Sequence, residues 1–342
     1  KWEEVPVGKP KDGQVRLRKT AVGLNYIDVY QRTGLYPIKE LPAVIGMEAA
    51  GVIEEVGPGV KGFKAGDRVA YTMGLGAYAQ ERVMGTNRLI PLPKGIDDKA
   101  AASMMLKGMT AYYLLHRTYK VKKGDTILVY AAAGGVGLIL CQWAEHLGAT
   151  VIGCVGSEDK AKLAKANGCA HTILYRTEKV PERVKALTGG EGVPVAYDSI
   201  GKATFMDSLD CLRPLGILAT FGNASGPVEP FSPAILAPKG SLFVTRQTLA
   251  THTRTPALMM ECANGLFDVV KNGKVKIAIN QTYPLAETAK AHRDLEARNT
   301  TGSTVLMPKR RRPFGSAAFV SVRVAAVRCS WTRRSPCWSS SA

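Results

Sequence analysis

The first 140 residues contain no cysteine, and no two of the seven cysteines lie closer than eight positions apart. A catalytic zinc ion needs three protein ligands and a structural one usually four Cys or His, yet the chain has no C-x-x-C pair. We therefore expect no bound metal. An odd number of cysteines without a pattern also indicates reduced thiols, which favours a cytoplasmic setting.

Long hydrophobic runs are missing as well. No uninterrupted apolar stretch reaches the length of a membrane span, and no signal-peptide pattern opens the chain. The residues after Lys1 already resemble the middle of a strand, so we expect the natural N-terminus to lie further upstream. A length of 342 residues predicts two domains with sizeable cores and no membrane span.

Acidic residues are few: 28 Asp and Glu stand against 46 Lys and Arg, for a formal charge of +18. Residues 309–342 hold one Lys, seven Arg and no acid, so the rest of the chain has 38 basic and 28 acidic residues. This tail lacks clear periodicity and follows the last expected strand, Ser303–Met307. We expect appended, disordered sequence there, rather than an arm that binds nucleic acid or a membrane surface.

The most informative stretch that is present covers residues 126–137, Thr-Ile-Leu-Val-Tyr-Ala-Ala-Ala-Gly-Gly-Val-Gly. An apolar strand runs into small residues, and a helical pattern follows from Val136 to about Leu147. Gly134 and Gly137 occupy the second and third positions of a G-x-G-x-x-G pattern, and the first is alanine. Such a turn exposes backbone N–H groups at a helix N-terminus, where a pyrophosphate can bind.

Strand-like and helix-like segments then alternate down to about residue 221. Segments of this length in strict alternation predict a doubly wound parallel sheet, the Rossmann α/β fold. An α/β domain that binds no nucleotide is the alternative, which the glycines after the first strand disfavour. The segments are strands at Thr150–Val155, His171–Leu174, Val193–Tyr197 and Gly216–Phe221, and helices at Glu158–Ala166, Glu178–Leu187 and Ala203–Leu212.

The end of the second strand indicates which nucleotide binds. An NAD site usually places an acid there for the ribose 2′-hydroxyl, whereas this strand ends Cys-Val-Gly-Ser at residues 154–157. Glu158 comes later, in the first turn of a helix, where the dipole favours it. Ser157, Lys160 and Tyr175 are candidates to hold a 2′-phosphate, although Lys160 is also compatible with a solvated helix position. The pattern favours NADPH.

The N-terminal third has a different character. Gln14–Ala21 alternates as a strand, and Gly51–Val60 contains strand-like pieces with a tight turn. A mostly apolar helical stretch, Lys99–Tyr119, connects this β-rich part to the nucleotide-binding part.

These residues resemble the zinc-independent medium-chain dehydrogenases/reductases, specifically the NADPH:quinone oxidoreductase (zeta-crystallin-like) family. The resemblance spans Trp2 to Pro308 and implies four parts: a GroES-like catalytic domain (1–107), a Rossmann NADPH-binding domain (108–247), a return to the catalytic domain (248–308) and the basic tail (309–342). It is carried by Gly23–Tyr30, Gly34–Pro37, Gly46–Gly51, Lys107–Tyr113, Ala131–Gly137, Tyr197–Ser199, Phe221–Asn223 and Lys239–Leu242.

The resemblance implies reduction of quinones by NADPH without metal, because Met47 stands where zinc-dependent relatives carry histidine. The cofactor supplies the hydride and the protein positions it. By resemblance Asn25, Tyr26 and Tyr30 lie near the nicotinamide as catalytic residues, and Asn25 and Tyr30 are candidates to hydrogen-bond the acceptor oxygen. Packing at a strand end is the alternative role for both tyrosines. The chain shows no acid–base pair or nucleophile motif of its own.

The expected cofactor contacts come from the connecting helix, the glycine turn and the ends of the later strands. They are Asn25, Thr110, Tyr112, Gly134, Gly135, Val136, Gly156, Ser157, Lys160, Tyr175, Ser199, Phe221, Gly222, Asn223, Ser225, Phe243, Val244 and Arg246.

Three further expectations follow from the resemblance. The substrate is a quinone or an enone, and the competing enzymatic activity is that of a 2-alkenal or enoyl reductase. A homodimer would form through the edge strand Ser241–Thr245. The competing class is an NADPH-binding protein that binds RNA or has a structural role, and salt-dependent binding of single-stranded nucleic acid would support it.

Overall fold

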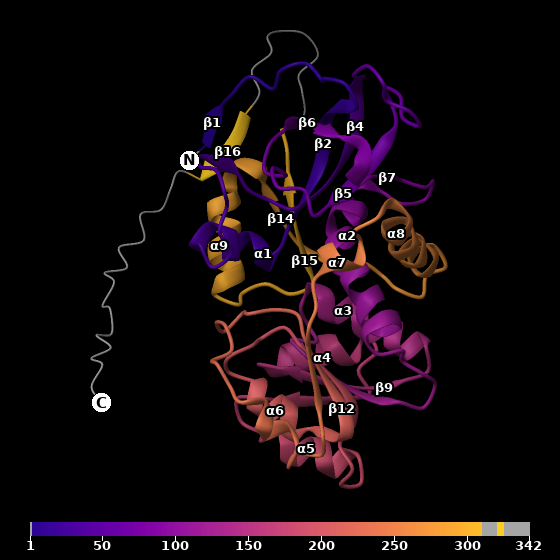
Figure 1. Cartoon of the computed structure of the whole chain (residues 1–342), viewed down its shortest axis with the longest axis vertical. Helices are drawn as coiled ribbons and strands as arrows, with labels where there is room; N and C mark the ends of the chain where they lie inside the picture. Colours follow the sequence, from indigo (N-terminus) through magenta and orange to yellow (C-terminus); the bar gives the residue numbers. More distant parts are fainter. Residues whose placement is uncertain (1, 310–319, 325–342) are drawn as a thin grey trace, which may run out of the picture.

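The structure is a computed structural model that describes residues 2–309 and 320–324. A β-rich domain lies at the top of Figure 1 and a Rossmann domain at the bottom, and helix α2 runs between them. Among the described residues, no helix combines the length and the apolar character that a membrane crossing requires.

Six parallel strands form the sheet of the Rossmann domain, in the order β10-β9-β8-β11-β12-β13. The first strand β8 and the fourth strand β11 are neighbours at the centre, so a ligand crevice opens at their carboxyl ends. The predicted fold class is confirmed. The strands are β8 Thr126–Tyr130, β9 Thr150–Val155, β10 His171–Leu174, β11 Val193–Asp198, β12 Leu212–Thr220 and β13 Phe243–Arg246. The helices between them are α3 Gly135–His146, α4 Glu158–Lys165, α5 Val180–Leu187 and α6 Phe205–Asp210.

The β-rich domain is built on a second sheet, in the order β14-β15-β2-β4-β5-β7, with β6 also paired to β2. Its last two strands come from the C-terminal part of the chain: β15 pairs antiparallel with β2, so the chain returns to this domain after the Rossmann sheet. The domain limits given above stay a prediction. The strands are β2 Gln14–Leu24, β4 Glu48–Val56, β5 Arg68–Thr72, β6 Glu81–Gly85, β7 Leu89–Pro91, β14 Ile279–Pro284 and β15 Ser303–Met307.

Helix α2, Asp98–Tyr113, joins the two domains and is buried along most of its length. The Asp97 side chain caps it by accepting a hydrogen bond from Ala100 N. The helix packs against β2 and β4 of the β-rich domain and also against α3 and α8. The predicted helix over Lys99–Tyr119 therefore exists, although its last turn, Leu114–Thr118, is wound as a wider π-helical turn. The core of both domains meets on this helix.

The other helices lie around the two sheets. Helix α1, Tyr26–Thr33, directly follows β2, and α9, Thr288–Glu296, lies beside it on the left of Figure 1. Helices α7 Leu249–His252 and α8 Pro256–Lys271 follow the Rossmann sheet. Single 3-10 turns occupy Thr86–Arg88, Pro233–Leu236 and Leu285–Glu287.

Part of the basic tail corrects our expectation of disorder. The segment β16, Val320–Val324, forms a strand between β1, Trp2–Glu4, and β3, Ala43–Val44. Its sequence Val-Ser-Val-Arg-Val alternates with a period of two and is rich in β-branched residues, which is the strand pattern that we overlooked. The other residues of the expected disordered tail, apart from Lys309, lie outside the described residues.

Candidate functional site

The turn after β8 has the geometry that the glycine pattern predicted. A Cβ at Gly137 would lie 2.3 Å from Ala131 O, so a side chain there would force α3 away from the strand. A Cβ at Gly135 would lie 2.8 Å from Cδ and Cε of Lys107, whose stem passes over the turn. Gly134 is the N-cap of α3, and the helix begins at Gly135. Backbone N–H groups are thus presented at a helix N-terminus, as an anionic phosphate requires.

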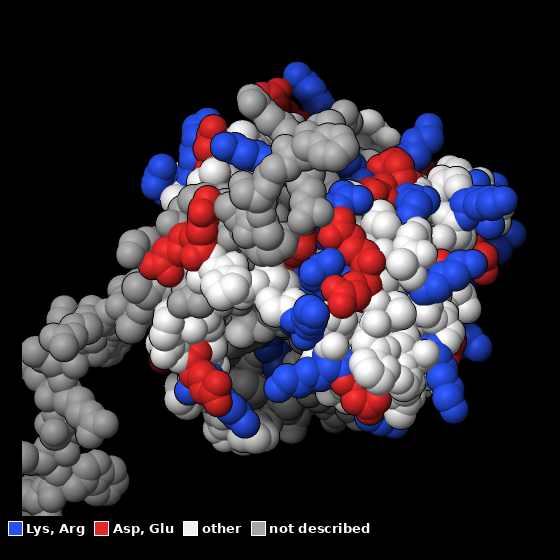
Figure 2. Space-filling view, turned by 90° about the horizontal axis from the view of Figure 1, so that it is seen from above, with Lys and Arg blue, Asp and Glu red and all other residues white. Residues whose placement is uncertain are grey.

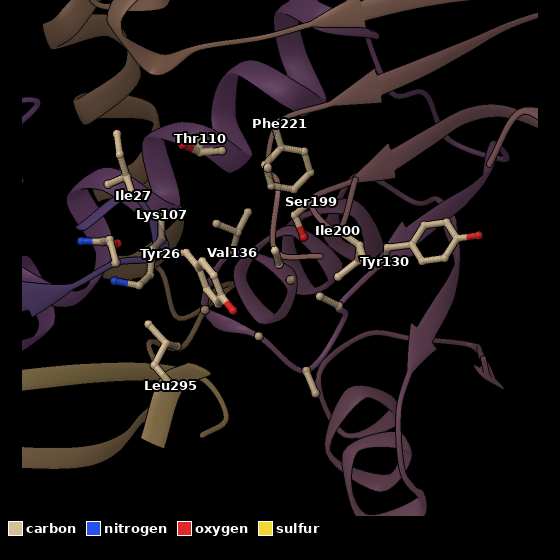
Figure 3. A pocket seen from close by; sticks show the side chains of 18 of the residues that line it. Tyr26, Ile27, Lys107, Thr110, Tyr130, Val136, Ser199, Ile200, Phe221 and Leu295 are labelled. Carbon is tan, nitrogen blue, oxygen red and sulfur yellow. The ribbon is translucent and has the colours of Figure 1, made fainter. Parts of the chain in front are cut away.

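A cavity of about 470 Å³ opens beside this turn, between the two domains. Figure 3 shows Val136, Ser199 and Phe221 around it, each from a different part of the Rossmann domain. The structure brings fourteen of the expected residues together in its lining: Asn25, Tyr26, Tyr30, Thr110, Gly134, Gly135, Val136, Gly156, Lys160, Tyr175, Ser199, Phe221, Gly222 and Arg246.

Helix α1 supplies the three residues expected at the reacting end. We expected a strand end at these three residues. Instead, strand β2 ends at Leu24, and the chain turns directly into helix α1. Asn25 is the N-cap, and its backbone N–H donates to Asp28 Oδ2 at 2.9 Å. Tyr26 and Tyr30 are one helical turn apart and their rings are 5.5 Å apart. Helical spacing therefore directs both rings to the cavity.

A buried carboxylate gathers three donors at the same end. Glu48 is fully buried and accepts from Asn25 Nδ2 at 2.8 Å, from Leu106 N at 2.7 Å and from Lys107 Nζ at 3.3 Å. Asn25, Leu106 and Lys107 all line the cavity. Glu48 therefore fixes the position of one amide and one ammonium group that face the same space.

Two tyrosines of the β-rich domain bridge to the Rossmann domain. Tyr30 Oη accepts from the backbone N–H of Asn223 at 2.8 Å, and Arg246 donates to Tyr36 Oη at 3.0 Å. Arg246 also donates to Gly222 O at 3.1 Å. Burial raises the pKa of Tyr30 above its ordinary value, so its hydroxyl stays protonated. Because Asn223 already donates to its oxygen, the Tyr30 proton is left for another acceptor.

A second cavity of about 250 Å³ continues the first beyond β9. It shares Gly156, Lys160 and Tyr175 with the main cavity and adds Arg176 and Ser157, which is the N-cap of α4. Its far wall is the segment 297–299, whose Arg298 also lines the main cavity. Burial lowers the pKa of Lys160, and the charges of Arg176 and Arg298 lower it further. Three cations thus repel one another around a space that suits an anion.

Five expected contacts do not line either cavity. Tyr112 lies on the opposite face of α2, where its hydroxyl donates to Glu261. Residues three apart, such as Thr110 and Tyr113, share the helix face that lines the cavity, and Tyr112 is not on that face. Ser225 lies behind the lining, where its hydroxyl donates to Ile200 O. Asn223 reaches the site through its backbone bond to Tyr30.

Phe243 and Val244 are the other two. They lie on β13, the edge strand of the Rossmann sheet, and the Phe243 side chain is 57% exposed. Neither residue lines a cavity, although Arg246 at the end of the same strand does, and their contact with the cofactor stays a prediction.

Sequence reasoning missed four charged side chains that lie at or directly behind the cavity walls. Lys107 and Glu48 belong to the segments Lys107–Tyr113 and Gly46–Gly51 that carry the family resemblance. Each is a single charged residue in an apolar segment, and this pattern indicates a buried charge that needs a partner. Arg176 and Arg298 carry no comparable signal, because only the folded chain brings them to α4. The residues present fit a dinucleotide: a glycine turn without room for side chains, a long cavity and a basic pocket at its end.

The fold and the site define a medium-chain dehydrogenase/reductase, in which a GroES-like domain and a Rossmann domain enclose one cleft. Comparison with known families supports this class: residues 11–94 match the alcohol dehydrogenase GroES-like domain, and residues 135–264 match the family described as zinc-binding dehydrogenase. Among the described residues, no group of three or more His, Cys, Asp or Glu side chains is placed to hold a metal ion.

The chain belongs, within this class, to the quinone oxidoreductase family. It is 51% identical over 308 residues to the quinone oxidoreductase of Pseudomonas aeruginosa, covering 90% of this chain and 95% of the relative. It is equally 51% identical over 315 residues to the 2-haloacrylate reductase of a Burkholderia species, with the same coverage. The crystal structure of Escherichia coli quinone oxidoreductase complexed with NADPH superposes with a TM-score of 0.87 at 45% identity, covering 90% of this chain and 94% of that one.

Proposed function

We propose that this protein reduces quinones with NADPH, and that the hydride passes at the end of the cavity lined by Asn25, Tyr26 and Tyr30. The observation that carries the proposal is the continuity of the space. One cavity joins the glycine turn to this end, and the basic pocket of Lys160 continues it on the other side. The relatives named above and their NADPH complex support the same activity.

Bound NADPH would supply the hydride, and the protein residues would position it and the acceptor. Backbone N–H groups at Gly135 and Val136, in the first turn of α3, would hold the pyrophosphate, and the basic pocket would hold the 2′-phosphate. Tyr30, kept protonated by its burial, has a proton available for an acceptor oxygen. The aromatic lining from Tyr26, Tyr36 and Phe221 suits a flat quinone ring.

The decisive experiment follows NADPH oxidation by the purified protein with benzoquinone, naphthoquinone and chloroacrylate as acceptors. We expect turnover with the quinones, and about 100-fold slower turnover for Tyr30→Phe, in line with the loss of one hydrogen-bond donor to the acceptor oxygen. If neither quinones nor enones are reduced by native protein, the proposed function is wrong.

A second candidate activity is the reduction of activated alkenes. This second activity is supported by the sequence identity to a 2-haloacrylate reductase, which equals the identity to a quinone oxidoreductase. The acceptor panel separates the two, because a preference for chloroacrylate over both quinones in kcat/KM would assign the alkene as the substrate.

Nucleic-acid binding, the alternative from a different class, has no support on the face that Figure 2 shows. Lys and Arg side chains there are interspersed with Asp and Glu over the β-rich domain and do not form a patch of one sign. We expect labelled single-stranded RNA to bind weakly and NADPH not to compete with it.

The assembly we propose is a homodimer in the cytoplasm. Strand β13 ends the Rossmann sheet, its outer edge pairs with no other described strand, and Phe243 and Leu215 near it are 57% and 66% exposed. A second copy pairing at this edge would cover both. The five cysteines of the described residues are free and buried, which suits a reducing compartment. Light scattering tests the dimer, and Phe243→Glu should yield a monomer.

A further inference from the structure

One ammonium group is buried at the reacting end of the cavity. Lys107 is only 6% exposed, yet it lines the cavity together with Tyr26. Figure 3 shows Lys107 and Tyr26 on the side of the cavity away from Tyr130. Among the described residues, the one hydrogen-bond partner of its Nζ is Glu48 Oε2, at 3.3 Å. An ammonium carries three N–H donors, so two remain for a ligand.

The position of this ammonium is set by the same carboxylate that holds Asn25. Glu48 Oε2 accepts from both Asn25 Nδ2 and Lys107 Nζ, so the amide and the ammonium are neighbours. The stem of Lys107 lies over Gly135 at the phosphate turn. Its charged end therefore lies between the place for the pyrophosphate and the place expected for the nicotinamide and the acceptor.

Stability does not explain a charge pair at this position. Removing two charges from water is costly, and replacing a buried ion pair by apolar residues of similar volume is often neutral or stabilising. Glu48 is fully buried and Lys107 almost so, and Lys107 lines a cavity whose other groups are mainly apolar and aromatic. A fixed positive charge in such a water-poor space is strongest where negative charge develops during a reaction.

We propose that Lys107 is a further catalytic residue, whose ammonium donates a hydrogen bond to the acceptor oxygen as that oxygen becomes negative, and that Glu48 positions it. This inference rests on the proposed function. In the balanced step, the quinone gains the hydride from NADPH, which leaves as NADP⁺, and the negative oxygen of the reduced quinone then takes one proton from water. Lys107 keeps its own proton and stabilises the charge.

The competing role is that Lys107 merely neutralises Glu48. The two roles are separated by the variants Lys107→Gln and Glu48→Gln/Lys107→Gln, because the double variant leaves no unpaired buried charge. Lys99→Gln is the matched control, since Lys99 is exposed on the same helix. Circular dichroism and NADPH fluorescence titration establish which variants are native and bind the cofactor.

The first readout is the rate of hydride transfer to naphthoquinone in a single turnover. We expect a loss of about 100-fold in both Lys107 variants and none in Lys99→Gln, which is the typical effect of removing one oxyanion donor. Recovery of the double variant to the wild-type rate would show that Lys107 only balances Glu48, and would overturn the inference.

The second readout needs no turnover. Nitrophenol is a phenol whose anion is yellow, so its absorbance in the complex with NADP⁺ reports the pKa of the bound phenol. We expect wild-type protein to lower this pKa by about 1 to 3 units, as a cation in contact does, and the double variant not to lower it. An equal pKa in both proteins would refute the inference. Wild-type protein that lowers it but reduces no quinone would refute the proposed function instead.

Discussion

The basic pocket beyond β9 predicts how strongly this protein prefers NADPH over NADH. Replacing Lys160 by Ala removes one of three cations that surround the second cavity, and replacing Arg298 removes another. Lys160 at present donates to Arg298 O at 2.8 Å, so its ammonium is held at the pocket wall rather than free in solvent. Burial lowers the pKa of Lys160, repulsion from Arg176 and Arg298 lowers it further, and a bound 2′-phosphate would offset that repulsion.

The magnitude follows from the strength of charge-assisted hydrogen bonds. Such a bond contributes about 1.5 to 3 kcal/mol, and the low end applies because Lys160 and Arg298 are partly solvated. Each single variant should therefore weaken NADPH binding by about tenfold, and the double variant by up to about 100-fold if the two act independently. NADH binding should change little, since NADH presents no phosphate to this pocket.

The assay is a fluorescence titration of each variant with NADPH and with NADH. Lys162→Ala is the control, because Lys162 lies on the same helix, its side chain is 80% exposed, and its one ion pair within residues 2–309 and 320–324 is with Asp159. Added salt should weaken NADPH binding to wild type more than NADH binding. As pH rises through the lowered pKa of Lys160, the ammonium loses its charge, and NADPH affinity should fall with it.

Equal losses for the two cofactors in Lys160→Ala and Arg298→Ala would refute this reasoning. They would mean that the bond from Lys160 to the backbone of Arg298 shapes the cleft as a whole and does not recognise the phosphate. No loss for either cofactor would place the 2′-phosphate elsewhere.

Three other outcomes are expected. Gly137→Ala should lower the free energy of unfolding by several kcal/mol, and therefore Tm, because the added Cβ would lie 2.3 Å from Ala131 O. An unchanged Tm would contradict the close packing of α3. Burial raises the pKa of Asp28 to about 7, although the hydrogen bond from Tyr78 acts in the opposite direction. The folded protein therefore binds the proton of the Asp28 carboxyl more tightly than the unfolded chain does. The free energy of unfolding of wild type should therefore fall relative to that of Asp28→Asn by roughly 1.4 kcal/mol per pH unit between about pH 4 and 7, and the difference should stay constant above pH 7. Urea unfolding of both proteins at each pH measures this difference. An unfolding free energy that depends on pH in the same way in both proteins would refute the prediction. Removing residues 309–342 should leave quinone reduction intact, because every cavity-lining residue of the described chain precedes this tail; loss of kcat in the truncated protein would show that the tail supports the site.

Most of the fold could be predicted from local sequence patterns. The alternation of strand and helix after residue 126 and the glycine turn predicted the doubly wound parallel sheet, because each element there is specified by its own period and end signals. The helical period separates two residues of one motif: Tyr112 lies on the other face of α2 from Thr110 and lines neither cavity, and its contact with the cofactor stays a prediction. Tyr26 and Tyr30 were placed at a strand end, although their spacing of four is helical.

What the sequence by itself determined is the turn and the sheet around it, including an acid-free end of β9, since these depend on residues within a few positions of one another. Only the tertiary structure decided the partners of the site. Glu48 meets Lys107 across 59 positions and Lys160 meets Arg298 across 138, where no local pattern acts. The cavity is enclosed by two domains, so its charges are set by contacts that exist only once both have folded against α2.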